Sequence, residues 1–267
     1  METPNEILVV KVGTSVLTNP ENVGELDLAS FKRIGQQVLE QQELGRHVAI
    51  VSSAAIAAGM AATGTTERPD RFTEIPEAQY LASVGWRHVV SAWADALPGK
   101  HVAEMLVTRH DLAEIGPSRE LTRVVERTFY HGGIPLLNEN DAVSHAEISF
   151  GDNDYAAGSF AAHLRRVRLM DAANVKLLLM TDADGFYARP DDPSSVIPVI
   201  HEITDEHRKA ARGSMSRVGS GGAESKIGAV TTAGLADVDT LIVNGREEDA
   251  INRALAGEIG THFALSK

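Results

Sequence analysis

Residues 138–154, NENDAVSHAEISFGDND, concentrate acidic side chains without any lysine or arginine to neutralise them. A charge run of this kind is usually a solvated surface segment. The same carboxylates can instead line a site that binds a substrate's ammonium group, with neutralising charge from elsewhere in the chain. The acidic residues are Glu139, Asp141, Glu147, Asp152 and Asp154.

Lys11 lies inside the apolar run ILVVKV and is followed by Gly-Thr-Ser. An unpaired ammonium group inside an apolar strand is costly. A phosphate would explain it, with Lys11 as a point charge and Gly13 allowing close backbone approach. The alternative is an edge-strand lysine that extends to water. Neither G-x-G-x-x-G nor G-x-x-x-x-G-K-[ST] occurs in the chain, so dinucleotide-fingerprint and P-loop sites are not indicated.

The segment GSGGAESK carries three glycines between Gly219 and Gly222, and a helical pattern begins directly after them. Glycines at this density are incompatible with a stable helix or strand interior, so we expect a loop that leads into a helix. Lys226 falls in the first turn of that helix, where the helix dipole disfavours a cation. Its position therefore predicts a bound anion, with a plain surface loop as the alternative.

Two further strand ends carry polar groups. In VSSAAIAAG (Val51–Gly59), hydroxyls at a strand-to-helix junction can bind an anion or act as an ordinary helix cap. TDADGFY (Thr181–Tyr187) follows a strongly apolar strand, which favours a ligand contact over a simple Asp-Gly turn. The histidines show no H-E-x-x-H spacing, and no nucleophile elbow G-x-S-x-G is present.

Apolar β-branched runs alternate with longer amphipathic stretches along the chain. Strands that are almost entirely apolar and separated by helices predict a mainly parallel sheet covered on both faces. In such a sheet the ligand lies beyond the carboxyl ends of the strands, where the polar segments above are found. The predicted strands are Ile7–Val12, His47–Ser52, Val102–Val107, Ile134–Asn138, Val175–Thr181 and Thr240–Val243. The predicted helices are Leu28–Leu44, Glu77–Leu97, Ser118–His131, Asp152–Leu164 and Ser225–Ala236.

Composition excludes several classes of protein. The formal net charge of −12 over 267 residues argues against a general nucleic-acid binder. The absence of cysteine removes disulfides and thiol chemistry and fits a reducing cytoplasm. No apolar window is long enough to span a membrane, and the N-terminus lacks the features of a signal peptide. We therefore expect one domain over residues 1–267, in the cytoplasm.

These segments together resemble the amino-acid kinase family. The resemblance covers nearly the whole chain, and its most specific part is NENDAV followed by GDND. It implies an open αβα sandwich, with the phosphoryl acceptor in about residues 1–165 and the nucleotide in about 166–267. It also implies a homo-oligomer, either a dimer or a tetramer. The matching pieces are VVKVGTSVL, AIVSSAAIAAG, YLASVG, MLVTRHD, PLLNENDAVSHAEISFGDND, LLLMTDADGFY, GSGGAESK and GTHFA.

The resemblance also implies a function and roles for residues. The expected reaction is ATP-dependent phosphorylation of the side-chain carboxylate of L-glutamate, the first step of proline synthesis. Mg²⁺ would be held mainly by the ATP phosphates, without a dedicated protein site. The implied catalytic residues are Lys11, Lys226 and Asp154. The implied acceptor residues are Ser53, Ala54, Asp141, Asp152 and Asn153. The implied nucleotide contacts are Lys11, Gly13, Thr181, Asp182, Gly219, Ser220, Gly221, Gly222 and Lys226.

The chain departs from the family's usual residues around the expected acceptor pocket. Ala54 stands where glycine is usual, Trp86 where glutamine is usual, and Tyr155 where a small polar residue is usual. These departures motivate one alternative, a paralogous kinase that acts on another small carboxylate or a phosphonate. A catalytically silent amino-acid sensor of the same fold is the alternative from a different class. The lysine pair disfavours the sensor.

Overall fold

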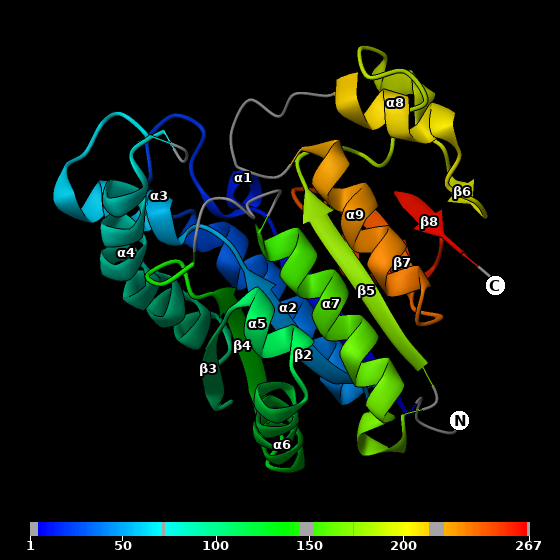
Figure 1. Cartoon of the computed structure of the whole chain (residues 1–267), viewed down its shortest axis with the longest axis horizontal. Coiled ribbons are helices and arrows are strands. Elements are labelled where there is room, and N and C mark those ends of the chain that lie inside the picture. The colour runs from blue at the N-terminus through cyan, green and yellow to red at the C-terminus, as the bar shows by residue number, and fades with distance from the viewer. Residues whose placement is uncertain (1–4, 71–72, 145–151, 173, 214–221, 266–267) are drawn as a thin grey trace.

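A single mixed sheet forms the centre of the computed structural model, which describes residues 5–70, 73–144, 152–172, 174–213 and 222–265 (Figure 1). The strand order is β3-β4-β2-β1-β5-β7-β8-β6. Every ladder is parallel except that between β7 and β8. The strands are β1 (Glu6–Val12), β2 (His47–Ser52), β3 (Val102–Val107), β4 (Ile134–Glu139), β5 (Asn174–Thr181), β6 (Val199–Ile200), β7 (Asp239–Asn244) and β8 (Thr261–Phe263).

Helices cover both faces of the sheet and enclose two apolar clusters. One cluster joins the sheet to α2, α3, α4 and α10, and the other joins it to α6, α7, α8 and α9. This arrangement confirms the predicted open αβα sandwich. The longer helices are α2 (Leu28–Glu43), α3 (Ala55–Thr63), α4 (Ile75–Ala96), α6 (Ile115–Tyr130), α7 (Asp152–Val167), α8 (Asp205–Gly213) and α9 (Ala223–Gly234). The shorter ones are α1 (Thr14–Leu17), α5 (Arg109–Ala113), α10 (Ala250–Leu255), η2 (Leu169–Asp171) and η3 (Pro193–Ser195).

Lys11 lies on an interior strand, so its interpretation as an edge-strand lysine is wrong. β1 pairs with β2 on one side and β5 on the other, with Lys11 opposite Val51 and Leu179. Residues along β1 alternate between the two apolar clusters, which explains why the whole strand is buried. Lys11 itself is only 5% exposed. A lysine at this position needs a partner of opposite charge.

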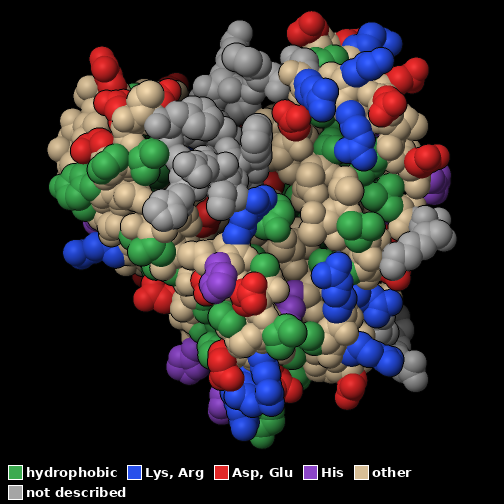
Figure 2. Space-filling view, viewed as in Figure 1, with side chains coloured by type: hydrophobic (Ala, Val, Ile, Leu, Met, Phe, Trp, Pro, Cys, Tyr) green, Lys and Arg blue, Asp and Glu red, His purple; other side chains and the backbone are tan. Residues whose placement is uncertain are grey.

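The six predicted strands all form, each within one residue of its predicted bounds, and the five predicted helices form within three residues. The predicted elements do not include β6 and β8, which contain two and three residues, the short helices α1, α5 and α10, or the nine-residue helices α3 and α8. Segments this short carry too few periods to stand out from loops. No helix in the described parts of the chain has the length and apolar character needed to cross a membrane. On the face shown in Figure 2, acidic and basic side chains are interspersed.

Candidate active site

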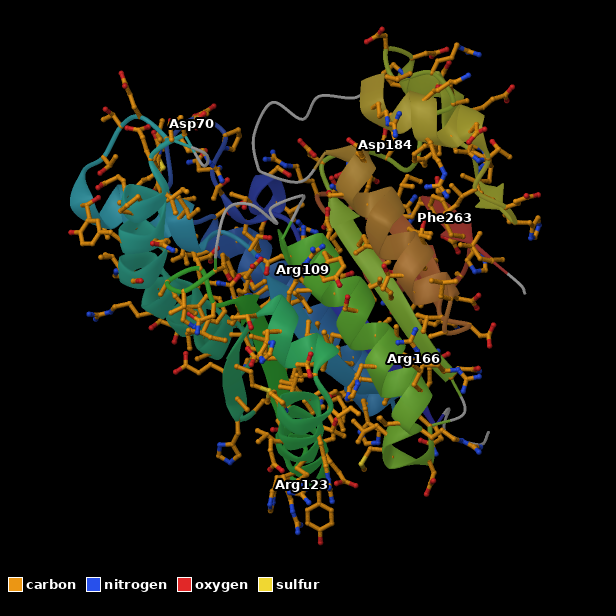
Figure 3. All side chains as sticks on the ribbon, viewed as in Figure 1. Asp70, Arg109, Arg123, Arg166, Asp184 and Phe263 are labelled. Carbon is orange, nitrogen blue, oxygen red and sulfur yellow. The ribbon has the colours of Figure 1, made fainter. Side chains whose placement is uncertain are left out.

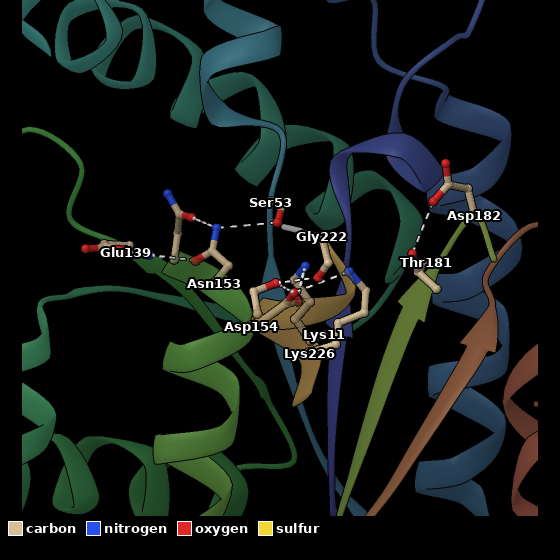
Figure 4. Close-up of polar contacts among 11 residues, drawn as sticks. Lys11, Ser53, Glu139, Asn153, Asp154, Thr181, Asp182, Gly222 and Lys226 are labelled. Atoms are coloured by element: carbon tan, nitrogen blue, oxygen red, sulfur yellow. Dashed lines mark hydrogen bonds and ion pairs between the residues drawn. The ribbon is translucent and has the colours of Figure 1, made fainter. Parts of the chain in front are cut away.

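Two lysines and one aspartate from three separate elements meet beyond the carboxyl end of β1 (Figure 4). Lys11 Nζ lies 2.5 Å from Asp154 Oδ1, and Lys226 Nζ lies 3.3 Å from Asp154 Oδ2. Asp154 is in the first turn of α7, and Lys226 is in the first turn of α9. The structure therefore brings together the three residues predicted to be catalytic. We call Lys11, Asp154 and Lys226 the charged triad.

The charged triad is almost completely shielded from solvent. The Asp154 side chain is fully buried, and those of Lys11 and Lys226 are 7% and 11% exposed. Burial raises the pKa of the Asp154 carboxyl, but Lys11 and Lys226 outweigh burial and hold that pKa well below its usual range. Burial also lowers the pKa of Lys11, against the opposing effect of Asp154. With both lysines charged, the triad keeps one excess positive charge, which suits an anionic ligand.

The backbone at Gly13 leaves space directly in front of Lys11. A Cβ atom at this position would lie 3.7 Å from Lys11 Nζ and 3.2 Å from the carbonyl oxygen of Met180. Gly13 also donates its backbone N–H to that same oxygen, over 3.0 Å, which ties the loop after β1 to β5. A Cβ atom here would be in tight contact with the Met180 carbonyl oxygen and would occupy space next to the ammonium group. The geometry fits a phosphate that approaches Lys11 along the backbone.

A second group of polar side chains lies beside the charged triad and contains three of the predicted acceptor residues. Asn153 donates from Nδ2 to Asn138 Oδ1 over 2.8 Å and, more weakly, to Ser53 Oγ over 3.4 Å. Its Oδ1 accepts the backbone N–H of Glu139 over 3.0 Å. Asn138 in turn donates to Asp141 Oδ2 over 3.3 Å. Asp152 begins α7, but its side chain lies outside what the structure describes.

Asn138 is a member of this group that sequence reasoning does not single out. It is 2% exposed at the end of β4 and connects Asn153 to Asp141. Its burial, which only the structure shows, is what identifies it, because a buried carboxamide needs hydrogen-bond partners. We refer to Ser53, Asn138, Asp141 and Asn153 as the acceptor group.

The predicted nucleotide residues Thr181 and Asp182 lie at the end of β5, where Thr181 Oγ1 donates to Asp182 Oδ1 over 3.1 Å. The loop after β7 crosses this strand end and was not predicted from the sequence. Gly245 N–H donates to the Thr181 carbonyl over 2.7 Å, and Arg246 donates to the Ser15 carbonyl over 2.6 Å. The β7 loop therefore braces both the TDADG segment and the loop after β1. In the glycine segment, Gly222 caps α9, whereas Gly219, Ser220 and Gly221 lie outside the described residues.

Ala54 adopts a left-handed backbone conformation, with φ of 82° and ψ of 5°. An L-residue other than glycine is strained there because its Cβ crowds the backbone. Its methyl group is 3% exposed and belongs to the apolar cluster under α2, α3 and α4. The core therefore has room for the methyl group of Ala54, and the unfavourable energy of the substitution comes from backbone strain at its positive φ.

Replacing Ala54 by glycine is expected to leave acceptor use nearly unchanged, with kcat/KM for glutamate within about threefold of the parent. The substitution relieves about 1–2 kcal/mol of backbone strain. This gain offsets two destabilising effects, the loss of the buried methyl group and the greater conformational entropy of glycine in the unfolded chain. The net change in unfolding free energy should stay within about 1 kcal/mol. Urea denaturation and steady-state kinetics measure both quantities.

Ala58→Gly is the matched control, because Ala58 is also buried in α3 and in the same apolar cluster but has no positive φ to relieve. It should lower stability by about 1–2 kcal/mol. A KM for glutamate that falls or rises more than tenfold in Ala54→Gly would show that the methyl group does reach the acceptor.

Trp86 and Tyr155, the other two departures from the family's usual residues, also make contacts within the fold. Trp86 is 7% exposed in α4, packs in the same cluster as Ala54 and donates from Nε1 to Glu104 on β3 over 3.1 Å. The guanidinium carbon of Arg109 lies over the Tyr155 ring, 3.8 Å from the centroid of that ring. Arg109 reaches this position from α5, beside the first turn of α7 (Figure 3). Tyr155 therefore contacts α5, on a different side of α7 from the fully buried Asp154.

The fold and the paired lysines near the carboxyl end of β1 define a phosphotransferase of the amino acid kinase family, whose family model matches residues 6–244. The chain belongs to this family. It is 38% identical to the glutamate 5-kinase of Geobacter sulfurreducens over 97% of this chain and 68% of the relative. It is 35% identical to the glutamate 5-kinase of Photorhabdus laumondii, over 98% of this chain and 70% of that relative.

Solved structures with the same fold are more distant in sequence. N-acetylglutamate synthase from Neisseria gonorrhoeae superposes with a TM-score of 0.66 at 17% identity, over 99% of this chain and 62% of that one. An isopentenyl phosphate kinase superposes with a TM-score of 0.57 at 18% identity, over 96% and 99% of the two chains. At this level of identity the likeness establishes the fold alone.

Proposed function

We propose that this chain is an ATP-dependent glutamate 5-kinase, which converts L-glutamate to L-glutamyl 5-phosphate in the first step of proline biosynthesis. Two curated relatives with that name match almost the whole chain. The observation that carries the proposal is the placement of Asn153 and Asp154. These consecutive residues at the start of α7 attach the acceptor group and the charged triad to the same helical turn. This arrangement supports the proposal, because polar side chains that could hold an amino acid lie directly beside a cationic site.

In the proposed reaction, a side-chain carboxylate oxygen of glutamate attacks the γ-phosphorus of ATP. The bond from that phosphorus to the β–γ bridging oxygen breaks, and ADP leaves with the electron pair. A carboxylate is already ionised at pH 7, so no general base is required. The proposed reaction therefore does not depend on a histidine or cysteine dyad, and none is seen at the site among the described residues. The difficulty of the reaction is that it brings two anions together.

Lys11 and Lys226 would neutralise the phosphate oxygens on either side of the transferred group, while Asp154 holds both ammonium groups in place. Preorganised charges in a water-poor site act strongly on the developing transition state, because they need no reorganisation during the reaction. Gly13, Thr181, Asp182 and the Gly219–Gly222 loop would contact the nucleotide. Mg²⁺, bound mainly by the ATP phosphates, would supply additional neutralising charge.

The acceptor group would hold glutamate by its α-amino and α-carboxyl groups. Asp141 offers a carboxylate for the ammonium group, and Ser53 and Asn153 offer hydrogen-bond donors. A substrate held at three points is oriented for in-line attack, which contributes to rate by positioning. Ala54 and Asp152 were also predicted to touch the acceptor. For Ala54 the enclosed methyl group leaves only its backbone to do so.

The test is an acceptor panel measured by ADP release, with the acyl phosphate trapped as a hydroxamate. L-glutamate should give the highest kcat/KM and a hydroxamate product. N-acetyl-L-glutamate, which lacks the ammonium charge, and the shorter L-aspartate should be poor acceptors. A clear preference for another carboxylate or a phosphonate would replace glutamate in the proposal. No ADP release with any acceptor would indicate the silent sensor instead, an alternative that the relatives do not favour.

Asp141→Asn should raise the KM for glutamate by about 10- to 100-fold, because a charge-assisted contact to the ammonium group is lost. The kcat and the KM for ATP should change far less, since the charged triad is intact. Steady-state kinetics with each substrate varied separately measures this split. Asp95→Asn, at an exposed position on α4, is the control and should match the parent. An unchanged KM for glutamate would remove Asp141 from the acceptor site.

The remaining sequence-based expectations stay predictions under this proposal. They comprise the division near residue 165 into acceptor and nucleotide parts, a homo-oligomer that is either a dimer or a tetramer, and a cytoplasmic location. Partners other than the small-molecule substrates, such as nucleic acid or membranes, are not expected. The net charge of −12 makes stable binding to nucleic acid unfavourable.

A further inference from the structure

Ser225 contacts Asp154, the central member of the charged triad. Its Oγ lies 2.6 Å from Asp154 Oδ2, and the residue is 8% exposed. The same Oγ lies 2.8 Å from the carbonyl oxygen of Gly222, the N-cap of α9. A serine hydroxyl has one proton to donate. The carboxylate is the closer and the charged acceptor, so it takes the stronger hydrogen bond.

The three donors to Asp154 differ in what they do when a nucleotide is bound. In the proposed reaction the ammonium groups of Lys11 and Lys226 are shared with phosphate oxygens. Their ion pairs with Asp154 then weaken, while the carboxylate stays fully buried. A buried carboxylate that loses donors is costly. The Ser225 hydroxyl is uncharged and has a short side chain, so it can remain on Asp154 while the lysines turn toward the phosphate.

Ser225 and Lys226 also contact the same carboxylate oxygen from neighbouring positions in the first turn of α9. The short serine contact fixes the distance between the start of α9 and Asp154. Since Lys226 is carried by the same turn, its ammonium group is placed relative to Asp154 by the serine as well as by its own charge. The contact to Gly222 joins this arrangement to the end of the glycine-rich segment.

We propose that Ser225 is a positioning residue that keeps the Asp154 carboxylate oriented between the two lysines while these lysines engage the phosphates. The inference rests on the proposed kinase function and deepens it. Ser225 itself need not touch the substrate. Its removal should therefore impair the chemical step more than it impairs nucleotide binding.

The kinetic test compares Ser225→Ala with Ser225→Thr, which keeps the hydroxyl. Ser225→Ala should lower kcat about 10- to 100-fold, the range expected for loss of one charge-assisted hydrogen bond at a preorganised site. The KM for ATP should change less than about threefold. Ser225→Thr should recover most of the lost kcat. Thr232→Ala is the control, because Thr232 is a partly exposed hydroxyl residue on the same helix whose Oγ1 bonds only the helix backbone carbonyl of Gly228 in the contacts described.

A second test does not depend on activity. Urea unfolding is measured for Ser225→Ala in the parent and in the Asp154→Asn background. If Ser225 acts through the carboxylate, its removal lowers the midpoint clearly in the parent and much less in the Asp154→Asn background. Equal losses in both backgrounds would show a plain helix-capping role through Gly222 and would overturn the inference. If Asp154→Asn does not fold, crystal structures of the parent and Ser225→Ala with a bound non-hydrolysable ATP analogue take its place, and an Asp154 carboxylate in the same position in both overturns the inference.

The two proposals fail in distinguishable ways. A parent enzyme without glutamate kinase activity contradicts the proposed function. Urea unfolding of Ser225→Ala in the parent and Asp154→Asn backgrounds still decides whether Ser225 acts through Asp154. An active parent whose Ser225→Ala variant keeps full kcat contradicts only the inference on Ser225. A rise in the KM for ATP with unchanged kcat would also contradict it, since it would make Ser225 a nucleotide-binding residue.

Discussion

Lys11→Met should reduce kcat for glutamate phosphorylation by about 10²- to 10³-fold, the cost typical of removing one preorganised electrostatic contact from a transition state. Methionine keeps the length and apolar character of the lysine stem but removes the charge. Lys11 lies on the interior strand β1, 2.5 Å from Asp154, so no neighbouring side chain of the strand can replace it. Steady-state kinetics at saturating ATP and glutamate measures the effect.

The matched control is Lys32→Met, at an exposed position on α2, which should leave kcat unchanged. Circular dichroism and the unfolding midpoint establish that the Lys11→Met variant is folded. We expect it to fold, because Lys226 and Ser225 still contact Asp154. Turnover within threefold of the parent would mean that the Lys11 charge does not act on the transferred phosphoryl group.

Asp154→Asn should have the largest effect on stability, lowering the unfolding free energy by about 3–5 kcal/mol, as expected when one member of a buried ion pair is removed. The substitution leaves the ammonium groups of Lys11 and Lys226, which are 7% and 11% exposed, without their shared carboxylate. Glutamate kinase activity should be lost together with stability, because both lysines lose their fixed positions. Urea denaturation at pH 7 measures the stability difference between parent and variant.

The dependence of that difference on pH follows from the lowered pKa of Asp154. The ordinary carboxyl pKa of 3.8 applies to the unfolded chain, and the folded state holds the group ionised to lower pH. The stabilisation is therefore fully present above the unfolded pKa and is lost as pH falls toward the folded pKa. We expect equal differences at pH 7 and pH 5 and a smaller one at pH 3. A difference that already shrinks at pH 5 would contradict the lowered pKa.

Asp192→Asn is the control for this experiment. Hydrogen bonds from Ser194 and Arg189 also lower the pKa of Asp192, to about 2, but this residue lies on the connection between β5 and β6 with a third of its side chain exposed. Solvent screens such a group, so the variant should lose much less stability than Asp154→Asn. Similar losses in the two variants would show that burial of Asp154 is not the source of its contribution.

Most of the regular elements were predictable because their apolar residues repeat with a clear period. β1 and β5 are predominantly apolar runs, and α7 begins at the residue expected from the pattern. The antiparallel β8 was not predicted, since three residues cannot establish a period. The loop after β7 was missed for a different reason. Arg246 and Gly245 act through contacts with Ser15 and Thr181, which lie far away in the sequence.

The sequence predicted the charged residues of the candidate site, but it did not predict all of the residues that contact them. An ammonium group within an apolar strand and a lysine at a helix N-terminus are each unfavourable alone, and this is why Lys11 and Lys226 stand out in the sequence. Asn138 and Ser225 carry no such conflict, because small polar residues are common at strand ends and in first helical turns. Their roles become visible only from the atoms that they contact.

The sequence alone determined that this protein has a mainly parallel sheet covered on both faces, with acidic and basic residues at the carboxyl ends of its strands. Hydrophobic periodicity and the energetic cost of a misplaced charge can both be read from short segments. Only the tertiary structure decided which of those charges meet. The strand order β3-β4-β2-β1-β5 does not follow the chain, and it places Lys11 on an interior strand. Asp154 and Lys226 are separated by 72 residues and touch because α7 and α9 pack on the same face of the sheet. Likewise, only the backbone at Ala54, with φ of 82°, shows that its methyl group strains the chain while packing in the core.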